Sequence, residues 1–145
     1  MKATIYDPLR KKHVAVTPEE QVRQKMIEFL HTKCKWPLGL MNSEVEISLS
    51  DVNSSFTSET KYRCDIVCYD KNVVPQIVVE CKAPDIKITQ KTFNQIWKYA
   101  IILKTNWVIV TNGVNTYCCK LNEEKNIFEF VNQFPRYTTT EIDGE

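Results

Sequence analysis

The spacing of apolar side chains switches along the chain between a helical period and strict alternation, and each stretch predicts one element. Residues 18–33 should form a helix because Thr17, Pro18 and Glu20 supply an N-cap, a first-turn proline and a capping-box glutamate. Its apolar positions recur at helical spacing and are Val22, Met26, Phe29 and Leu30. A second helix is predicted over residues 89–104. Its expected buried stripe comprises Phe93, Ile96, Trp97, Ala100 and Ile101.

Shorter stretches between the helices and after them have the patterns of β-strands. Residues 44–49 alternate between polar and apolar side chains, as a half-buried strand does. Residues 106–111 are almost wholly apolar, which predicts a central strand covered on both faces. The other predicted strands cover residues 62–69, 74–82, 116–121 and 127–131. Turn signals at Asp70-Lys71-Asn72 and Asn112-Gly113 connect neighbouring strands.

This order of elements predicts an α/β (α+β) fold with a mixed central sheet flanked by helices. A chain of 145 residues is long enough for one such domain with a sizeable core. We expect a single domain over residues 1–145, with its packed core at about 6–134 and a polar tail at 135–145. Residues 51–58 show no pattern and are predicted to form a loop, which either contacts a substrate or simply faces solvent.

Composition and charge are those of a globular domain rather than of a strongly basic nucleic-acid binder. Apolar residues make up 43% and charged residues 26% of the chain, and the net charge is +1. Any nucleic-acid surface must therefore be local, because the overall electrostatic attraction is weak. The candidates for it are Arg10, Lys11, Lys12, Arg23 and Lys98. A basic run like the one that begins at Arg10 is more often simply a solvated surface.

Cysteine and histidine usage disfavours a zinc site. The six cysteines show no Cys-x-x-Cys spacing, and the chain has two histidines. Cys64 and Cys68 alternate with Ile66 on a predicted strand, so we expect all three on one face, with buried thiols. No apolar stretch has the length of a membrane span and the N-terminus lacks a secretory signal segment, which favours a cytoplasmic location.

The predicted strand 74–82 is the most informative for function, because it is apolar until it ends in Glu80 and Lys82. Glu-x-Lys occurs three times in the chain, but only this copy closes an apolar strand. Alternation places Glu80 and Lys82 on one face, and a hairpin at residues 70–72 brings Asp65 of the preceding strand close to Glu80. Two neighbouring carboxylates repel each other unless a cation lies between them.

Mg²⁺ is the expected cation, with Mn²⁺ as an alternative, because it takes a few oxygen ligands together with waters and substrate phosphate. Asp65 and Glu80 would bind it, with the backbone carbonyl of Cys81 as a further ligand. Lys82 would orient an attacking water or stabilise developing charge, which is the chemistry of phosphodiester cleavage. A salt-bridge cluster in which Lys82 or Arg63 pairs with the acids would explain the same residues without catalysis.

Both predicted helices carry further candidates. Gln95 and Tyr99 lie four residues apart on one helix face, beside the apolar stripe, where they could reach a phosphate or steady a water. A position at the boundary between core and surface would also explain them. Glu20 could face the sheet as a third carboxylate, although the capping box alone accounts for it.

Together these residues resemble the PD-(D/E)xK nuclease superfamily, which has an Asp, a spacer and Glu-x-Lys, with Gln-x-x-x-Tyr on the next helix in its RecB-type branch. More narrowly, residues 6–121 resemble the N-terminal nuclease domain of type I restriction enzyme R subunits. The motifs that carry this resemblance are Tyr6-Asp7-Pro8-Leu9-Arg10-Lys11-Lys12, Thr17-Pro18-Glu19-Glu20-Gln21-Val22-Arg23-Gln24, Arg63-Cys64-Asp65-Ile66-Val67, Val79-Glu80-Cys81-Lys82-Ala83-Pro84 and Val110-Thr111-Asn112-Gly113.

The resemblance implies a restriction-endonuclease-like fold and a Mg²⁺-dependent deoxyribonuclease, acting as an endonuclease or exonuclease in restriction or repair. It makes Asp65, Glu80 and Lys82 the catalytic core, supported by Gln95 and Tyr99. An acidic residue of the first helix, Glu20 or less readily Glu19, becomes the accessory metal ligand.

The implied partners are DNA and a motor, methylase or specificity subunit, or a second copy of the chain. In the family this domain belongs to a larger motor subunit. The present chain has no Walker motif, so the resemblance does not carry over ATP dependence, site recognition or methylation control. The alternative is a non-catalytic nucleic-acid or protein interaction module that retains the nuclease fold.

Overall fold

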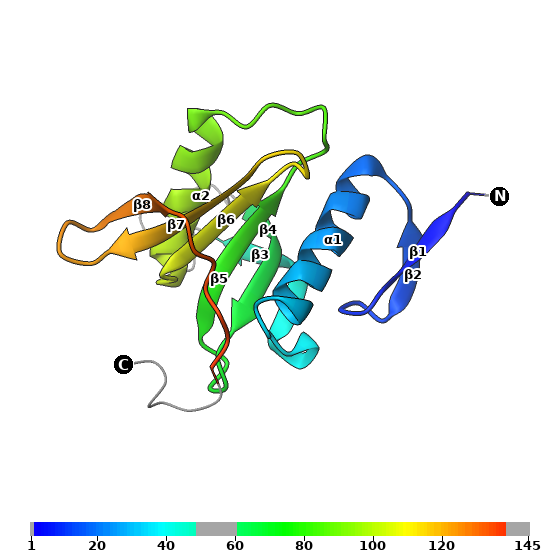
Figure 1. Ribbon diagram of the computed structural model, residues 1–145, viewed down its shortest axis with the longest axis horizontal. Helices are drawn as coiled ribbons and strands as arrows, with labels where there is room; N and C mark the ends of the chain where they lie inside the picture. Colours follow the sequence, from blue (N-terminus) through cyan, green and yellow to red (C-terminus); the bar gives the residue numbers. More distant parts are fainter. Residues whose placement is uncertain (1, 49–60, 139–145) are drawn as a thin grey trace.

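A six-stranded mixed sheet carries one helix on each face (Figure 1). The computed structural model describes residues 2–48 and 61–138. In spatial order the strands are β3 (Met41–Ser48), β4 (Lys61–Tyr69), β5 (Pro75–Cys81), β6 (Trp107–Thr111), β7 (Thr116–Asn122) and β8 (Ile127–Val131). The β5–β6 pair is parallel and every other neighbouring pair is antiparallel. The predicted α+β architecture with a mixed sheet is confirmed.

Helix α1 (Pro18–Thr32) begins as the sequence predicts, because the backbone N–H of Glu20 donates to Oγ1 of Thr17 at 3.0 Å. Helix α2 (Gln90–Leu103) forms the crossover between the parallel strands β5 and β6. The remaining elements are β1 (Thr4–Asp7), β2 (Lys12–Ala15) and the short 3-10 helix η1 (Leu38–Leu40). The β1–β2 hairpin lies beside α1, on the side away from the main sheet (Figure 1).

Each helix buries an apolar stripe against its own face of the sheet. The α1 layer comprises Val22, Met26, Ile27 and Leu30, packed on Ile66, Ile77, Val79 and Ile109. The α2 layer comprises Phe93, Ile96, Tyr99 and Ala100, packed on Val67, Val78, Val108 and Val110. Strand β6 is fully buried at its centre and contributes to both layers, so its prediction as a central strand is confirmed.

The predicted stripe of α2 is wrong at Ile101, which is 45% exposed. Tyr99 is buried instead, and its ring stacks on that of Tyr62 from β4 with the centroids 3.8 Å apart. This pairing rotates the buried face of the helix toward Tyr99, because an aromatic stack covers more apolar surface than one isoleucine at the edge of the stripe.

Strand β4 does not alternate regularly between the two faces. Ile66 and Cys68 lie in the α1 layer, whereas Cys64 lies in the α2 layer. The prediction that all three share one face is therefore wrong, although their burial is confirmed. The change of face falls at Asp65, and Glu44, which lies opposite it on β3, has left-handed backbone with φ 55°.

The chain continues to contact the domain beyond Pro135, the start of the expected polar tail. The backbone N–H of Tyr137 donates to the carbonyl of Cys34 at 2.8 Å, and its ring packs edge-on against Trp36. Residues 139–145 and the predicted loop 51–58 lie outside the described residues. Within the described ranges, neither helix has the length and apolar character needed to cross a membrane.

Candidate active site

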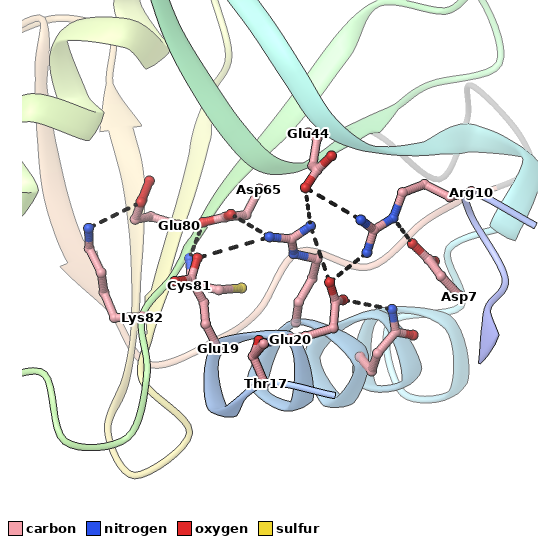
Figure 2. Close-up of polar contacts among 12 residues, drawn as sticks. Asp7, Arg10, Thr17, Glu19, Glu20, Glu44, Asp65, Glu80, Cys81 and Lys82 are labelled. Carbon is pink, nitrogen blue, oxygen red and sulfur yellow. Dashed lines mark hydrogen bonds and ion pairs between the residues drawn. The ribbon is translucent and has the colours of Figure 1, made fainter. Parts of the chain in front are cut away.

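The candidate site lies where β4 and β5 separate. The last pair of their ladder in this direction is Ile66↔Val79, and Asp65 is the next residue of β4. Its Oδ2 accepts a hydrogen bond from the backbone N–H of Cys81 at 2.7 Å (Figure 2). A side-chain carboxylate thus bonds β5 where a backbone carbonyl would otherwise do so, and this holds Asp65 beside Glu80.

Asp65 and Glu80 are close enough to influence each other's charge. The side chain of Asp65 is buried, and this burial together with the negative charge of Glu80 raises the pKa of Asp65 to about 7. The Cys81 N–H and the guanidinium of Arg23 favour the ionised form but do not offset the rise. An additional cation between the two carboxylates would stabilise both in their ionised forms.

Glu80 is held in place by contacts on the α2 side of the sheet. The hydroxyl of Tyr62 donates to its Oε2, and Nζ of Lys82 lies 3.4 Å from its Oε1. Burial and the charge of Glu80 raise the pKa of Tyr62 well above its ordinary value, so the hydroxyl remains a donor. Tyr99 stacks on Tyr62 and therefore supports Glu80 indirectly.

The structure thus brings Asp65, Glu80 and Lys82 together, but by a different route from simple alternation along two strands. Lys82 and Glu80 contact each other as expected, and Lys82 is partly exposed. Asp65 instead contacts a residue of α1 on the opposite side of the sheet: its Oδ1 lies 3.2 Å from Nη2 of Arg23. The three side chains converge because β4 and β5 part at this point.

Arg23 occupies the centre of a group of carboxylates. Its Nη1 lies 3.1 Å from Glu44 and 3.7 Å from Glu20, and its Nη2 lies 3.2 Å from Asp65 and 4.0 Å from Glu19. The residue is 6% exposed. Arg23 was a predicted nucleic-acid contact, but in this conformation its guanidinium is turned inward to the acids.

Glu20 lies in the same network, and its carboxylate does not act in a capping box. It accepts hydrogen bonds from Nη2 of Arg10 at 2.7 Å and from Nε2 of Gln24 at 3.0 Å. The helix cap therefore explains the hydrogen bond from the backbone N–H of Glu20 to Thr17, but it does not explain the position of the Glu20 side chain. Glu20 approaches the site through Arg23 and does not contact Asp65 in the described structure.

The other predicted surface residues divide into two groups. Arg10 is committed to carboxylates: it pairs with the fully buried Asp7, with Glu20, and with Glu44 at 3.4 Å. The exposed side chains are those of Lys11, Lys12, Gln95 and Lys98. The side chain of Gln95 makes no hydrogen bond to any residue that the structure describes, whereas Tyr99 is linked to Glu80 through Tyr62.

Asp7, Glu44 and Tyr62 complete this network, and neither periodicity nor spacing assigns a role to any of them, although Asp7 lies in one of the motifs that carry the family resemblance. Asp7 precedes a turn, where carboxylates are usually exposed, and Glu44 lies on the polar side of a predicted strand. The left-handed backbone of Glu44 accompanies its turn toward Arg10 and Arg23, and no local sequence signal predicts that conformation. Tyr62 could be recognised only once α2 had been placed over β4.

The chemistry of the donor set fits a hard divalent cation. Carboxylates of Asp65, Glu80 and Glu20 and the carbonyl of Cys81 are the oxygen ligands that Mg²⁺ prefers. The six cysteines are buried free thiols, as predicted. Among the described residues no three acidic, histidine or cysteine side chains are arranged to hold a metal ion, and Arg23 contacts both Asp65 and Glu20.

Comparison with protein families matches residues 18–135 to the family described as Type I restriction enzyme R protein N terminus. The match starts at the first residue of α1 and extends past β8, so it includes the main sheet, both helices and Asp65, Glu80 and Lys82, whereas Asp7 and Arg10 precede it. The β1–β2 hairpin precedes it. Comparison with curated proteins gives no match.

Proposed function

This chain belongs to the family of type I restriction enzyme R protein N-termini, and from that premise we propose that it is a Mg²⁺-dependent deoxyribonuclease. The observation that carries the proposal is the convergence of Asp65, Glu80 and Lys82 where β4 and β5 part. Two acids and a lysine at one point of a strand pair provide both a cation site and a group that can act on a phosphate.

The residues that would hold the cation are Asp65, Glu80 and the carbonyl of Cys81, with Glu20 as an accessory ligand. Mg²⁺ supplies neutralisation of phosphate charge and makes a nearby water more acidic when bound. Asp65 is oriented by the Cys81 N–H, which leaves its other oxygen for further contacts.

Lys82 and Tyr62 have separate roles in this proposal. Lys82 is partly exposed beside Glu80, where its ammonium can orient the attacking water and stabilise charge that develops on the phosphate. Tyr62, stacked on Tyr99, fixes one oxygen of Glu80 through its hydroxyl. A carboxylate held in this way loses less conformational freedom when it binds a ligand.

DNA and other subunits of a restriction system are the proposed partners. Phosphate contacts dominate DNA affinity, but the net charge is only +1, and two of the five candidate contacts, Arg10 and Arg23, are paired with carboxylates. We therefore propose that a motor, methylase or specificity subunit, or a second copy, provides much of the DNA affinity. A role in restriction or repair would place the protein in the cytoplasm, with the DNA.

A cleavage assay tests the proposal. Supercoiled plasmid and linear single- and double-stranded DNA are incubated with the purified protein and Mg²⁺ or Mn²⁺. We expect nicking or degradation that Asp65→Asn and Lys82→Ala each reduce at least about 100-fold. The matched control is Lys125→Ala, because Glu123-Glu124-Lys125 has the same Glu-x-Lys spacing in an exposed turn. Equal loss in the control variant would contradict the assignment.

A non-catalytic interaction module is the second candidate, and the pairing of Asp65 with Arg23 favours it. An arginine paired with the carboxylate of Asp65 is what a domain that had lost its metal would need in order to keep the buried acid compensated. Wild-type protein that binds DNA but cleaves none of the three DNA substrates with either metal would support this second candidate.

A further inference from the structure

Arg23 is a buried cation that contacts the carboxylate at which the proposed metal would bind. Its Nη2 lies 3.2 Å from Oδ1 of Asp65, the oxygen that the Cys81 N–H does not occupy. The same guanidinium serves Glu44 through Nη1 at 3.1 Å. A divalent cation bound to Oδ1 of Asp65 would lie next to the guanidinium, and the repulsion between the two positive charges disfavours both contacting this oxygen at once.

The pairing of Arg23 is incomplete, which indicates that the guanidinium can be moved. Its Nε is buried without a hydrogen-bond acceptor among the described residues. An unsatisfied buried donor costs about 1–3 kcal/mol. The conformation with Arg23 on Asp65 is therefore stabilised by charge pairing rather than by a fully satisfied hydrogen-bond network.

Arg23 also has other carboxylates to receive it. Glu44 and Glu19 are substantially exposed, and Nη atoms of Arg23 already lie within 4.0 Å of both. Leaving Asp65 therefore does not leave the guanidinium unpaired, which would be the main cost of moving a buried charge. Arg10 helps to hold this arrangement, because it contacts Glu44 and Glu20 from the β1–β2 hairpin.

We propose that Arg23 is an internal counter-ion that closes the metal-free site, and that a divalent cation binds only by displacing it from Asp65. This inference rests on the proposed function, since it assumes that Asp65 is a metal ligand. Arg23 then acts as a positioning residue: it compensates Asp65 without metal and is transferred toward Glu44 and Glu19 when metal binds. The apparent metal affinity is the intrinsic affinity multiplied by the fraction of molecules in which Arg23 does not cover Asp65.

Calorimetric titration with Mn²⁺ alone tests the proposal on wild type, Arg23→Met, Arg23→Lys and Asp65→Asn. We expect Arg23→Met to bind Mn²⁺ at least about tenfold more tightly than wild type. Arg23→Lys should lie between them, because it keeps the charge but not the forked geometry. Asp65→Asn should abolish binding. The matched control is Arg63→Met. Arg63 lies on β4, the strand of Asp65, and its side chain is 58% exposed and lies 4.0 Å from Glu46.

The outcomes separate this inference from the proposed function. If wild type binds Mn²⁺ through Asp65 but Arg23→Met binds equally or more weakly, the counter-ion role is wrong and the metal site stands. If neither wild type nor Arg23→Met binds Mn²⁺, the metal site is wrong and the inference fails with it. An increase of the same size in Arg63→Met would also overturn the inference, because general charge removal would explain it.

A second measurement uses the wild-type protein and does not depend on the variant folding. The Nε–H signal of Arg23 is followed by ¹H–¹⁵N NMR during titration with Mg²⁺. We expect it to shift as the ion binds, because the buried Nε changes its surroundings when the guanidinium leaves Asp65, while the Arg63 signal stays in place. An unchanged Arg23 signal at saturating Mg²⁺, with a shifted Cys81 amide, would overturn the proposal.

Discussion

Arg10 links the N-terminal hairpin to the site, and replacing it with methionine should destabilise the whole domain. Its guanidinium contacts Asp7, Glu20 and Glu44. Asp7 is fully buried, and Arg10 itself has only 18% of its side chain exposed. The Arg10→Met variant keeps the apolar stem but removes the cation paired with the buried carboxylate of Asp7, which keeps only the uncharged donors of Leu9 and Gln24 among the described residues.

The expected loss is about 3 kcal/mol. Removing one partner of a buried ion pair costs roughly 3–5 kcal/mol, and the partial exposure of Arg10 places it at the low end of that range. For a domain of this size, each kcal/mol lowers the melting temperature by roughly 2–4 °C, so the Tm should fall by about 6–12 °C. Replacing a solvated surface arginine would instead lower the free energy of unfolding by less than about 0.5 kcal/mol.

Thermal and urea unfolding followed by circular dichroism measure this loss. Lys11→Met and Lys12→Met are the matched controls, because they are exposed neighbours in the same basic run and should change stability by less than about 0.5 kcal/mol. Burial would raise the pKa of Asp7, but the hydrogen bonds from Arg10 and Leu9 outweigh it, so the pKa of Asp7 is lowered in the folded protein.

The lowered pKa adds a pH signature to the same experiment. A carboxyl with a depressed folded pKa contributes stability above its unfolded value of 3.8, and that contribution disappears as the pH falls through the folded pKa. The difference in the free energy of unfolding between wild type and Arg10→Met should therefore become smaller at acid pH. A variant as stable as the two lysine controls at neutral pH would refute the burial argument and return Arg10 to the set of DNA-contact candidates.

Three further predictions concern Asp65, the cysteines and the first helix. Because the pKa of Asp65 is raised to about 7, the free energy of unfolding of the metal-free protein should fall as the pH rises from about 4 to 7. Urea unfolding with EDTA measures this decline, which Asp65→Asn should lack. Wild type and Asp65→Asn with the same dependence on pH would contradict the prediction. Burial raises the pKa of Cys64 and of Cys118 to about 12, and all six thiols are buried. They should therefore react with Ellman's reagent far more slowly in the native than in the unfolded protein. A thiol that reacts rapidly in the native protein would contradict its burial in the core. Thr17→Ala should lower the free energy of unfolding by about 1 kcal/mol in thermal unfolding, while Thr17→Ser should be nearly neutral because it keeps the hydroxyl. Equal losses in the two variants would show that the hydroxyl contact does not stabilise the helix.

Local signals in the sequence account for most of the fold. The predicted helix 18–33 matches α1 to within one residue because Thr17 and Pro18 define its start by short-range contacts. The strand predicted at 127–131 matches β8 because turn residues bound it on its N-terminal side. Alternation failed on β4, where Cys64 moves to the α2 layer, because the contacts of Asp65 depend on β5 and α1 rather than on β4 itself.

The candidate site was predictable in its residue types but not in its connections. An apolar strand that ends in Glu80 and Lys82 indicates a functional group of charges, and the structure places Asp65 next to them. The partner of Asp65 is 42 residues away in the sequence, at Arg23, and no periodic pattern predicts such a pair. The same holds for Glu44, whose role depends on a left-handed backbone conformation.

Diffraction from crystals grown with Mn²⁺ would locate the metal itself. We predict one anomalous difference peak within roughly 2–2.5 Å of carboxylate oxygens of both Asp65 and Glu80, with the Arg23 guanidinium moved away from Asp65. Crystals saturated with Mn²⁺ that show no peak there, and in which Arg23 remains paired with Asp65, would contradict the proposed metal-dependent nuclease site.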